Sequence, residues 1–146
     1  MSSKPDWEDP QIIGRNKEKG HVRAIPFPDE QSALKGGNST YYRSLNGKWS
    51  FHYSKNPAER PIDFYKIGFD VGDWEKIEVP GTFELQGYGM PYYLTTTYPP
   101  SLRTRSAPNI DKSDNPVGSY KREFMIPENW RNREIFIHSS FCFRRR

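Results

Sequence analysis

The chain has 146 residues, a length suited to a single domain, and it is polar, with 34% hydrophobic residues and a mean hydropathy of -0.94. Three of its 22 basic residues are Arg144, Arg145 and Arg146, and without them the excess over the 18 acidic residues falls to one. These features exclude a nucleic-acid-binding protein, which needs clustered basic residues, and a membrane-spanning chain, which needs a long apolar run.

The first 40 residues show little hydrophobic periodicity and many turn formers, among them Pro26 and the Gly36-Gly37 pair. Such a composition predicts an extended arm. Within the arm we expect a short helical turn from Asp29 to Leu34, because the Asp29 carboxylate can cap exposed backbone amides.

Strand patterns begin at Tyr41. Trp49, Phe51 and Tyr53 alternate with polar residues, which places the aromatic side chains on one face of a half-buried strand. The Asn46-Gly47 dipeptide before them predicts a hairpin turn, because both residues tolerate positive φ.

Further short strands are expected at 74–79, 92–98, 118–126 and 133–138, with a turn at 127–129 between the last two. We expect a helical turn within 56–64, and six prolines between 80 and 116 exclude a long helix there. Several short strands with few helices predict an all-β sandwich. Its expected aromatic core residues are Trp49, Phe51, Trp74 and Phe124.

Four sequence blocks, taken in order, form a recognisable family pattern. They are Asp-Trp-Glu-Asp-Pro at 6–10, Ser-Leu-Asn-Gly-Lys-Trp-Ser-Phe at 44–51, Pro-Gly-Thr-Phe-Glu-Leu-Gln-Gly-Tyr-Gly-Met-Pro-Tyr-Tyr at 80–93, and Asn-Pro-Val-Gly-Ser-Tyr at 115–120. Together they resemble the amino-terminal sugar-binding domain of β-galactosidases from glycoside hydrolase family 2. One block would be weak evidence, but four in order make chance similarity a poor explanation.

The resemblance implies a jelly roll of the galactose-binding type, so the expected fold is an all-β, partial jelly-roll sandwich with an extended N-terminal arm. The arm covers 1–40, the sandwich 41–138 and a divergent basic tail 139–146. The family's sandwich continues past Ile137, where this sequence departs from it. We therefore expect an amino-terminal piece of a longer enzyme, with incomplete sheets and marginal stability by itself.

The resemblance also implies the activity of the intact enzyme, which is hydrolysis of terminal non-reducing β-D-galactose residues in β-galactosides. Both catalytic glutamates of that family belong to a later barrel domain, so we expect no catalytic residue and no activity in this chain. The domain would brace the barrel and help to form the galactose pocket. The local carboxylates are interpreted as solvated charges, and those considered are Glu75, Glu78, Glu84, Asp111 and Asp114.

One substrate-binding residue follows from the resemblance. The family's Tyr-x-Asn-x-x-Tyr-Pro motif presents an Asn amide to the sugar, and the matching run at 93–99 has Thr95 at the Asn position. A hydroxyl can donate and accept a hydrogen bond, so Thr95 is the candidate sugar contact, and ordinary strand packing is the competing interpretation that a threonine-rich run favours. Nearby tyrosines suit either sugar stacking or core packing, and these are Tyr88, Tyr92, Tyr93 and Tyr98.

No cofactor or metal site is expected in the chain, because His21, His52 and His138 lie far apart in sequence and structural zinc needs four clustered ligands. The resemblance implies magnesium (Mg) or sodium (Na) in the intact enzyme, bound outside this segment. The lone Cys142 and the absence of an apolar signal segment predict a cytoplasmic location. Expected partners are the β-galactoside substrate, the remaining domains of the same enzyme and further copies in a homo-oligomer.

Three alternatives stay open from the sequence. A stand-alone carbohydrate-binding module without catalysis would suit a jelly roll, and it would bind galactose as a folded monomer. A basic interaction protein would depend on the terminal arginines, although near-neutral charge elsewhere argues against it. Within the family, a β-glucuronidase or β-mannosidase is the nearest competitor, but the blocks at 6–10 and 87–91 look more like those of galactosidases.

Overall fold

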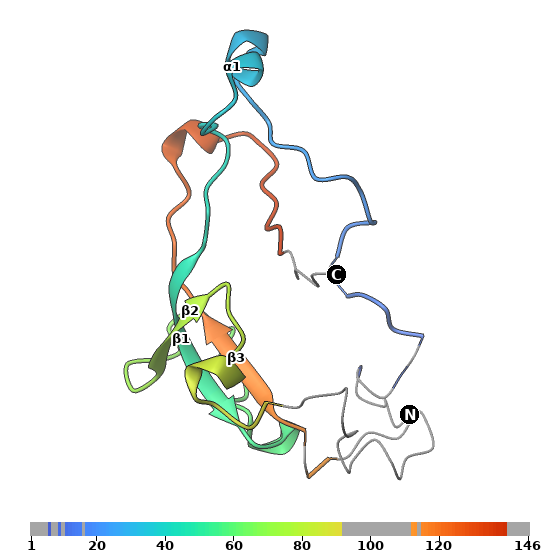
Figure 1. Cartoon of the computed structure of the whole chain (residues 1–146), viewed down its shortest axis with the longest axis vertical. Coiled ribbons are helices and arrows are strands. Elements are labelled where there is room, and N and C mark those ends of the chain that lie inside the picture. Colours follow the sequence, from blue (N-terminus) through green and yellow to red (C-terminus); the bar gives the residue numbers. More distant parts are fainter. Residues whose placement is uncertain are drawn as a thin grey trace. The chain divides into compact units, whose positions relative to one another are not determined.

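The computed structural model describes residues 6, 9, 11–15, 17–91, 112–113 and 115–139. Within these ranges lie three β-strands, β1 (Gly47–Ser54), β2 (Glu75–Val79) and β3 (Val117–Lys121), and one short helix, α1 (Glu30–Lys35; Figure 1). One-turn 3-10 helices occupy Pro57–Glu59, Glu84–Gln86 and Glu128–Trp130. This content confirms the predicted all-β class, and the jelly-roll connectivity stays a prediction.

The chain divides into two compact units. The first unit comprises Met1–Arg23 with Ser44–Arg122 and contains the sheet, and the second comprises Ala24–Arg43 with Glu123–Arg146 and contains α1. The division expected from the sequence, into an arm, a sandwich and a tail, stays a prediction.

β1 is the central strand of an antiparallel sheet with the order β2-β1-β3 (Figure 1). Its register places Phe51 beside Glu75 of β2 and Tyr120 of β3, so these three side chains share one face of the sheet. Phe51 and Ile77 are buried on this face, and each is 1% exposed. Burial of each side chain stabilises the sheet by about 1.5–3 kcal/mol.

The predicted alternation along β1 is confirmed for the aromatic face, but the prediction of a half-buried strand is wrong. Ser50 and Ser54, on the opposite face, are 6% and 3% exposed, because the chain between β1 and β2 covers that side. Trp74 from this connection lies 5.4 Å from His52 between ring centroids. β1 is therefore covered on both faces, and the expected core residues Trp49 and Trp74 are half-buried.

The hairpin predicted at Asn46-Gly47 does not form. β1 begins at Gly47, where φ is 117°, and its partners are the distant strands β2 and β3. A hairpin here would need the Leu45 carbonyl as a backbone acceptor. That carbonyl instead accepts hydrogen bonds from the Trp49 indole at 2.8 Å and from the Arg122 guanidinium at 2.7 Å. These bonds satisfy the backbone without a hairpin.

Two other predicted strands end early or do not form. β3 ends at Lys121 instead of Ile126, and residues 133–138 are irregular. Backbone groups in a strand need a hydrogen-bonded neighbour, and within the described ranges neither segment has a neighbouring strand. Phe124, which was expected in the core, is 40% exposed. The strand predicted at 92–98 lies outside the described residues.

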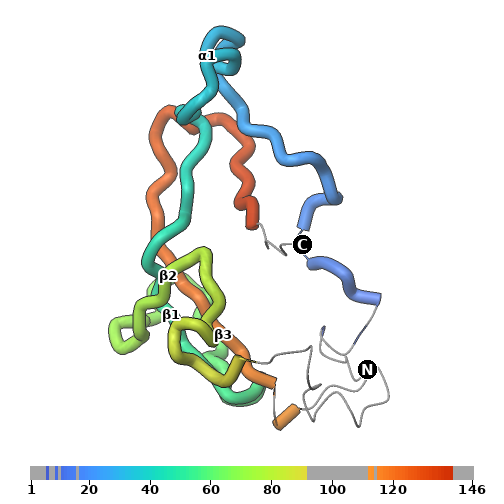
Figure 2. Tube along the Cα trace, viewed as in Figure 1, coloured from blue at the N-terminus to red at the C-terminus, as the bar shows by residue number. Residues whose placement is uncertain are grey.

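Hydrogen bonds from side chains to backbone hold the second unit together. The Arg43 guanidinium donates to the Met125 carbonyl, and the Trp130 indole donates to the Thr40 carbonyl, each at 2.8 Å. These bonds join two segments that are distant in sequence and run side by side (Figure 2). They take the place of the β-ladder that the apolar pattern of this region predicted.

The predicted helical turns are confirmed. α1 begins after Asp29, whose carboxylate accepts hydrogen bonds from the Ser32 amide and hydroxyl at 2.8 Å each, and these bonds lower the pKa of Asp29. The turns expected within 56–64 and at 127–129 are present as one-turn helices. Across the part of the chain that the structure describes, no helix is both long and apolar enough to cross a membrane.

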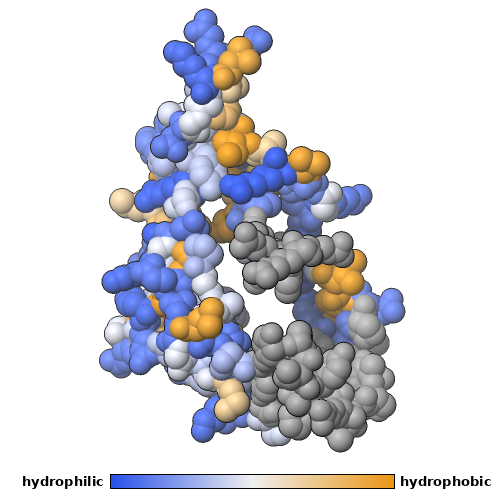
Figure 3. Space-filling view, in the orientation of Figure 1, coloured by the Kyte–Doolittle hydropathy of each residue, from blue (hydrophilic) through white to orange (hydrophobic). Residues whose placement is uncertain are grey.

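Hydrophobic side chains also reach the surface, where they are interspersed with hydrophilic ones on the face seen in Figure 3. Ile67 is 105% exposed and Leu34 is 81% exposed. Their removal would leave no cavity, in contrast to the removal of a buried ring.

Phe51→Ala is expected to lower the free energy of unfolding by about 3–5 kcal/mol, because it removes a buried ring and leaves a cavity. Ile67→Ala is the control, and it should change this free energy by less than about 0.5 kcal/mol. Urea unfolding followed by tryptophan fluorescence measures both values. Equal effects of the two substitutions would contradict the placement of Phe51 at the centre of the core.

Candidate functional site

The third sequence block, at 80–93, is described as far as Pro91. It follows β2 through a cis peptide bond before Pro80 and makes one turn of 3-10 helix at Glu84–Gln86. The turn ends at Gly87, whose φ of 97° and ψ of 8° are left-handed and favour a residue without Cβ. The chain thereby reverses direction and passes over the aromatic face of the sheet.

Five aromatic rings from three chain segments form a cluster on this face. Phe51 lies 6.0, 4.7 and 4.9 Å from Phe83, Tyr88 and Tyr120 between ring centroids, and Tyr53 lies 5.9 Å from Phe83. Each aromatic pair contributes about 0.5–1.5 kcal/mol beyond its buried area. Tyr88, which the sequence assigned equally to sugar stacking or packing, is a packing residue in this cluster.

Two glycines provide the room that the cluster needs. A Cβ at Gly118 would lie 2.8 Å from the Phe51 ring, and a Cβ at Gly89 would lie 3.0 Å from the Tyr53 hydroxyl. Both distances are shorter than ordinary van der Waals contact between carbon and its neighbours. Gly89 of the third block and Gly118 of the fourth are therefore explained by close approach to aromatic side chains.

The Gln86 side chain fastens the same segment to the edge of β2. Its Oε1 accepts from the Glu78 amide at 2.8 Å, and its Nε2 donates to the Glu78 carbonyl at 3.0 Å and to the Thr82 carbonyl at 3.4 Å. The amide thus satisfies the outer backbone groups of Glu78 as a neighbouring strand would. We call this set of hydrogen bonds the Gln86 clamp.

The Tyr88 hydroxyl donates a hydrogen bond to the Glu75 carboxylate, which joins the turn to the first residue of β2. This bond is the main reason that the pKa of Tyr88 is raised above its ordinary value, with burial and the carboxylate charge adding to it. Glu75 is exposed, as the solvated-charge interpretation requires, and it has this additional structural role.

The remaining carboxylates behave differently from one another. The Glu78 side chain is exposed, whereas Glu84 is half-buried. Burial of the Tyr120 phenol raises its pKa, and the nearby charge of Glu84 raises it further. Asp111 and Asp114 lie outside the described residues. Of these carboxylates, Glu75 accepts a hydrogen bond from a tyrosine of the aromatic cluster, and Glu84 acts on the cluster through its charge.

Metal ligands do not cluster in the described part of the chain. No group of three or more His, Cys, Asp or Glu residues there could hold a metal ion. His21 Nδ1 lies 2.9 Å from the Lys19 carbonyl, and His52 Nδ1 lies 3.3 Å from the Ser54 hydroxyl.

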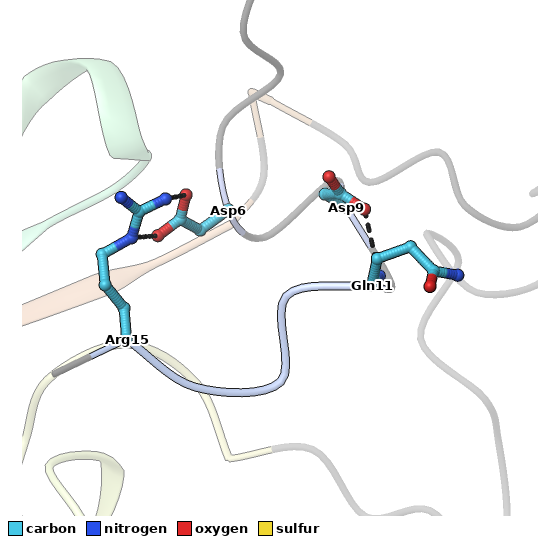
Figure 4. A network of polar contacts seen from close by, with 4 residues as sticks. All are labelled: Asp6, Asp9, Gln11 and Arg15. Atoms are coloured by element: carbon cyan, nitrogen blue, oxygen red, sulfur yellow. Dashed lines mark hydrogen bonds and ion pairs between the residues drawn. The ribbon is translucent and has the colours of Figure 1, made fainter. Parts of the chain in front are cut away.

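The first sequence block forms an exposed local network. The Arg15 guanidinium donates two hydrogen bonds of 2.8 Å to the Asp6 carboxylate (Figure 4). The backbone amide of Gln11 donates to the Asp9 carboxylate at 3.0 Å. The two partners of the ion pair are 66% and 48% exposed, so solvent screening keeps its contribution to stability small. Trp7, Glu8 and Pro10 lie outside the described residues.

The predicted sugar contact, Thr95, lies outside the described residues, as do Tyr92, Tyr93, Tyr98 and Cys142. The structure therefore describes the segment that leads to Thr95 but not Thr95 itself. Sequence reasoning missed the roles of Gln86 and Glu75. A polar residue in a turn-rich run gives no local signal that its amide will meet a strand edge, although Gly81 marks a close backbone approach nearby.

A family model described as the sugar binding domain of glycosyl hydrolases family 2 matches residues 42–140. The match includes the second, third and fourth sequence blocks and therefore all three strands and the segment with the Gln86 clamp. The first block lies before the matched range.

Individual proteins extend the similarity to nearly the whole chain. A β-galactosidase of Halalkalibacterium halodurans is 40% identical over 137 residues, which are 92% of this chain and 14% of that protein. A β-galactosidase of Priestia megaterium is 35% identical over 91% of this chain and 13% of its own length. The β-galactosidase large subunit of Leuconostoc lactis is 34% identical over 94% of this chain and 24% of its own length. The chain thus spans less than a quarter of each of these relatives.

Glu75→Ala is expected to lower the pKa of Tyr88 toward the ordinary tyrosine value of about 10, because the phenol loses its acceptor. The hydrogen bond contributes stability that is fully present below that ordinary pKa and is lost as the pH rises through the raised folded-state pKa. Alkaline titration of tyrosinate absorbance measures the shift, with Tyr88→Phe subtracted to isolate this residue. Glu78→Ala, on the same strand, is the control. An unchanged Tyr88 titration in Glu75→Ala would show that the bond is absent.

Proposed function

The chain belongs to glycosyl hydrolase family 2, whose sugar-binding domain it contains, and we propose that it serves as this domain in a β-galactosidase. The enzyme would hydrolyse terminal non-reducing β-D-galactose residues of β-galactosides. The observation that supports the proposal is the match of more than 90% of this chain to the Halalkalibacterium halodurans and Priestia megaterium β-galactosidases.

The proposed role of this chain is to support and shape a sugar site whose catalytic groups lie elsewhere. Retaining glycosidases use two carboxyl groups about 5–5.5 Å apart, one as acid/base and one as nucleophile. Glu75, one of the carboxylates considered, accepts a hydrogen bond from the Tyr88 hydroxyl instead. The chain alone is therefore expected to bind no transition state and to hydrolyse no galactoside.

Thr95 is the proposed sugar contact of this chain. It occupies the position of an Asn in the family motif, and its hydroxyl can make one hydrogen bond where the amide could make more. The described segment up to Pro91 brings the chain over the sheet shortly before this residue in sequence. This chain would then contribute to sugar binding, while glutamates of another domain would carry out catalysis.

The remaining partners follow from the same proposal. The domain would contact the other domains of its enzyme, and the complete enzyme would assemble as a homo-oligomer in the cytoplasm. A chain with one cysteine, Cys142, is suited to a reducing compartment. Magnesium or sodium, if the enzyme uses it, would be held by residues outside this chain.

The proposed function is tested by nitrophenyl glycoside hydrolysis with the β-galactosidase that contains this chain and with the chain alone. We expect the enzyme to release nitrophenol from the β-galactoside faster than from the β-glucuronide or β-mannoside, and the chain alone to release none. Hydrolysis by the chain alone would contradict the proposed division of roles. Galactose binding by a folded, monomeric chain that occurs without further domains would favour a stand-alone carbohydrate-binding module.

Thr95→Ala in that enzyme is expected to raise KM for the galactoside about 2- to 10-fold, which corresponds to loss of one hydrogen bond worth about 0.5–1.5 kcal/mol. Thr95→Asn should lower KM below that of Thr95→Ala, because the amide restores a donor and an acceptor. Steady-state kinetics measures both, with Thr97→Ala as the matched control. Equal KM values for Thr95→Ala and Thr97→Ala would leave Thr95 as a packing residue.

A further inference from the structure

We propose that residues 134–138 are a docking edge for a second copy of this chain, which would pair with it as an antiparallel β-strand. We call these residues the 134–138 edge. They follow the one-turn helix Glu128–Trp130 and belong to the second unit. The inference goes beyond the proposed function, because the pairing needs neither a substrate nor a further domain.

Three consecutive apolar side chains of this edge reach solvent. Ile135, Phe136 and Ile137 are 40%, 66% and 73% exposed, and every residue from 131 to 139 is exposed. Successive side chains of a strand point to opposite faces, so a strand formed here would be apolar on both faces. Contiguous exposed apolar residues are typical of an interaction site, whereas single ones are ordinary surface features.

The backbone of the edge also has groups left to pair. The Arg133 amide donates to the Trp130 carbonyl at 3.2 Å, and the Arg133 Cζ lies 3.9 Å from the centroid of the Tyr41 ring, so the start of the edge is held in place. From 134 to 137, within the described ranges, no backbone group bonds to another backbone group. A row of such amides and carbonyls next to β-branched side chains is a template for a further strand.

The described part of the second unit contains no buried apolar core that could cover these side chains. The buried hydrophobic residues of the described ranges are Phe51 and Ile77, and both belong to the first unit. In the second unit, Phe124, Met125 and Ile126 are exposed as well. An interface would therefore supply the apolar burial that this unit lacks.

The sequence of the edge is complementary to itself in one antiparallel register. When Phe136 of each copy lies opposite Phe136 of the other, Ile135 faces Ile137 and Glu134 faces His138, and symmetry repeats both pairs. A parallel pairing in register would place Glu134 beside Glu134, and like charges directly opposite each other destabilise a strand pair. An antiparallel pairing centred on Ile135 would place Glu134 opposite Phe136. The self-complementary register is the reason to assign the edge to a second copy.

Sedimentation of the 146-residue chain over a range of concentrations tests the proposal. We expect a monomer–dimer equilibrium with a Kd on the order of 10–100 µM, as suits a small interface. Ile135→Lys and Ile137→Glu should each raise this Kd about 10- to 30-fold, because each substitution disturbs two cross-strand pairs. Ile67→Lys, at an exposed isoleucine of the first unit, is the matched control and should leave the Kd unchanged.

A mixture of the Ile135→Lys and Ile137→Glu chains tests the register itself. In a mixed dimer the introduced lysine lies opposite the introduced glutamate, and the two remaining isoleucines lie opposite each other. We therefore expect the mixture to dimerise with a Kd within about threefold of that of the unsubstituted chain. Two variants that had merely failed to fold would not restore each other's association.

Three results would overturn the inference. The first is a chain that stays monomeric at every concentration, which would leave the edge to be covered by other parts of a longer protein. The second is large aggregates without a dimer, and the third is a mixture that associates no more tightly than either variant alone. The readout is molecular mass, so a failure of the proposed function, measured by galactoside hydrolysis, is distinguishable from a failure of this inference.

Discussion

Burial of the Phe51 ring is the interaction on which the described sheet depends. The ring is 1% exposed at the middle of β1, and it contacts Tyr120 of β3 and both Phe83 and Tyr88 from the segment after β2. These partners come from parts of the chain that are distant in sequence. Removal of apolar surface from water thus holds together segments that are distant in sequence. The antiparallel ladders provide hydrogen bonds for the backbone groups around the ring.

The candidate site derives its geometry from that sheet. The segment after β2 crosses the Phe51 face and is held there in two ways, by the packing of aromatic rings and by hydrogen bonds of Gln86 and Tyr88 to β2. Ring packing tolerates several orientations, whereas the hydrogen bonds of the Gln86 amide fix both distance and direction.

Local sequence signals were sufficient where the interaction that decides the structure is itself local. The Asp29 cap, the strand that ends before Pro80 and the aromatic alternation along β1 are of this kind, and the four ordered blocks identified the family. The hairpin does not form where Arg122, far along the chain, donates together with Trp49 to the Leu45 carbonyl. The strand at 133–138 has the right apolar pattern but no neighbour in the described ranges, and Gln86 gains its role only when the chain folds back on β2.

Amide hydrogen exchange of the chain, resolved by residue, tests the central claim most directly. Because β1 lies between two strands and carries the buried Phe51, its amides should exchange more slowly than those of α1, which has no buried residue. Exchange of the β1 amides as fast as that of the α1 amides would contradict the account, because the sheet would then have no stable centre around Phe51.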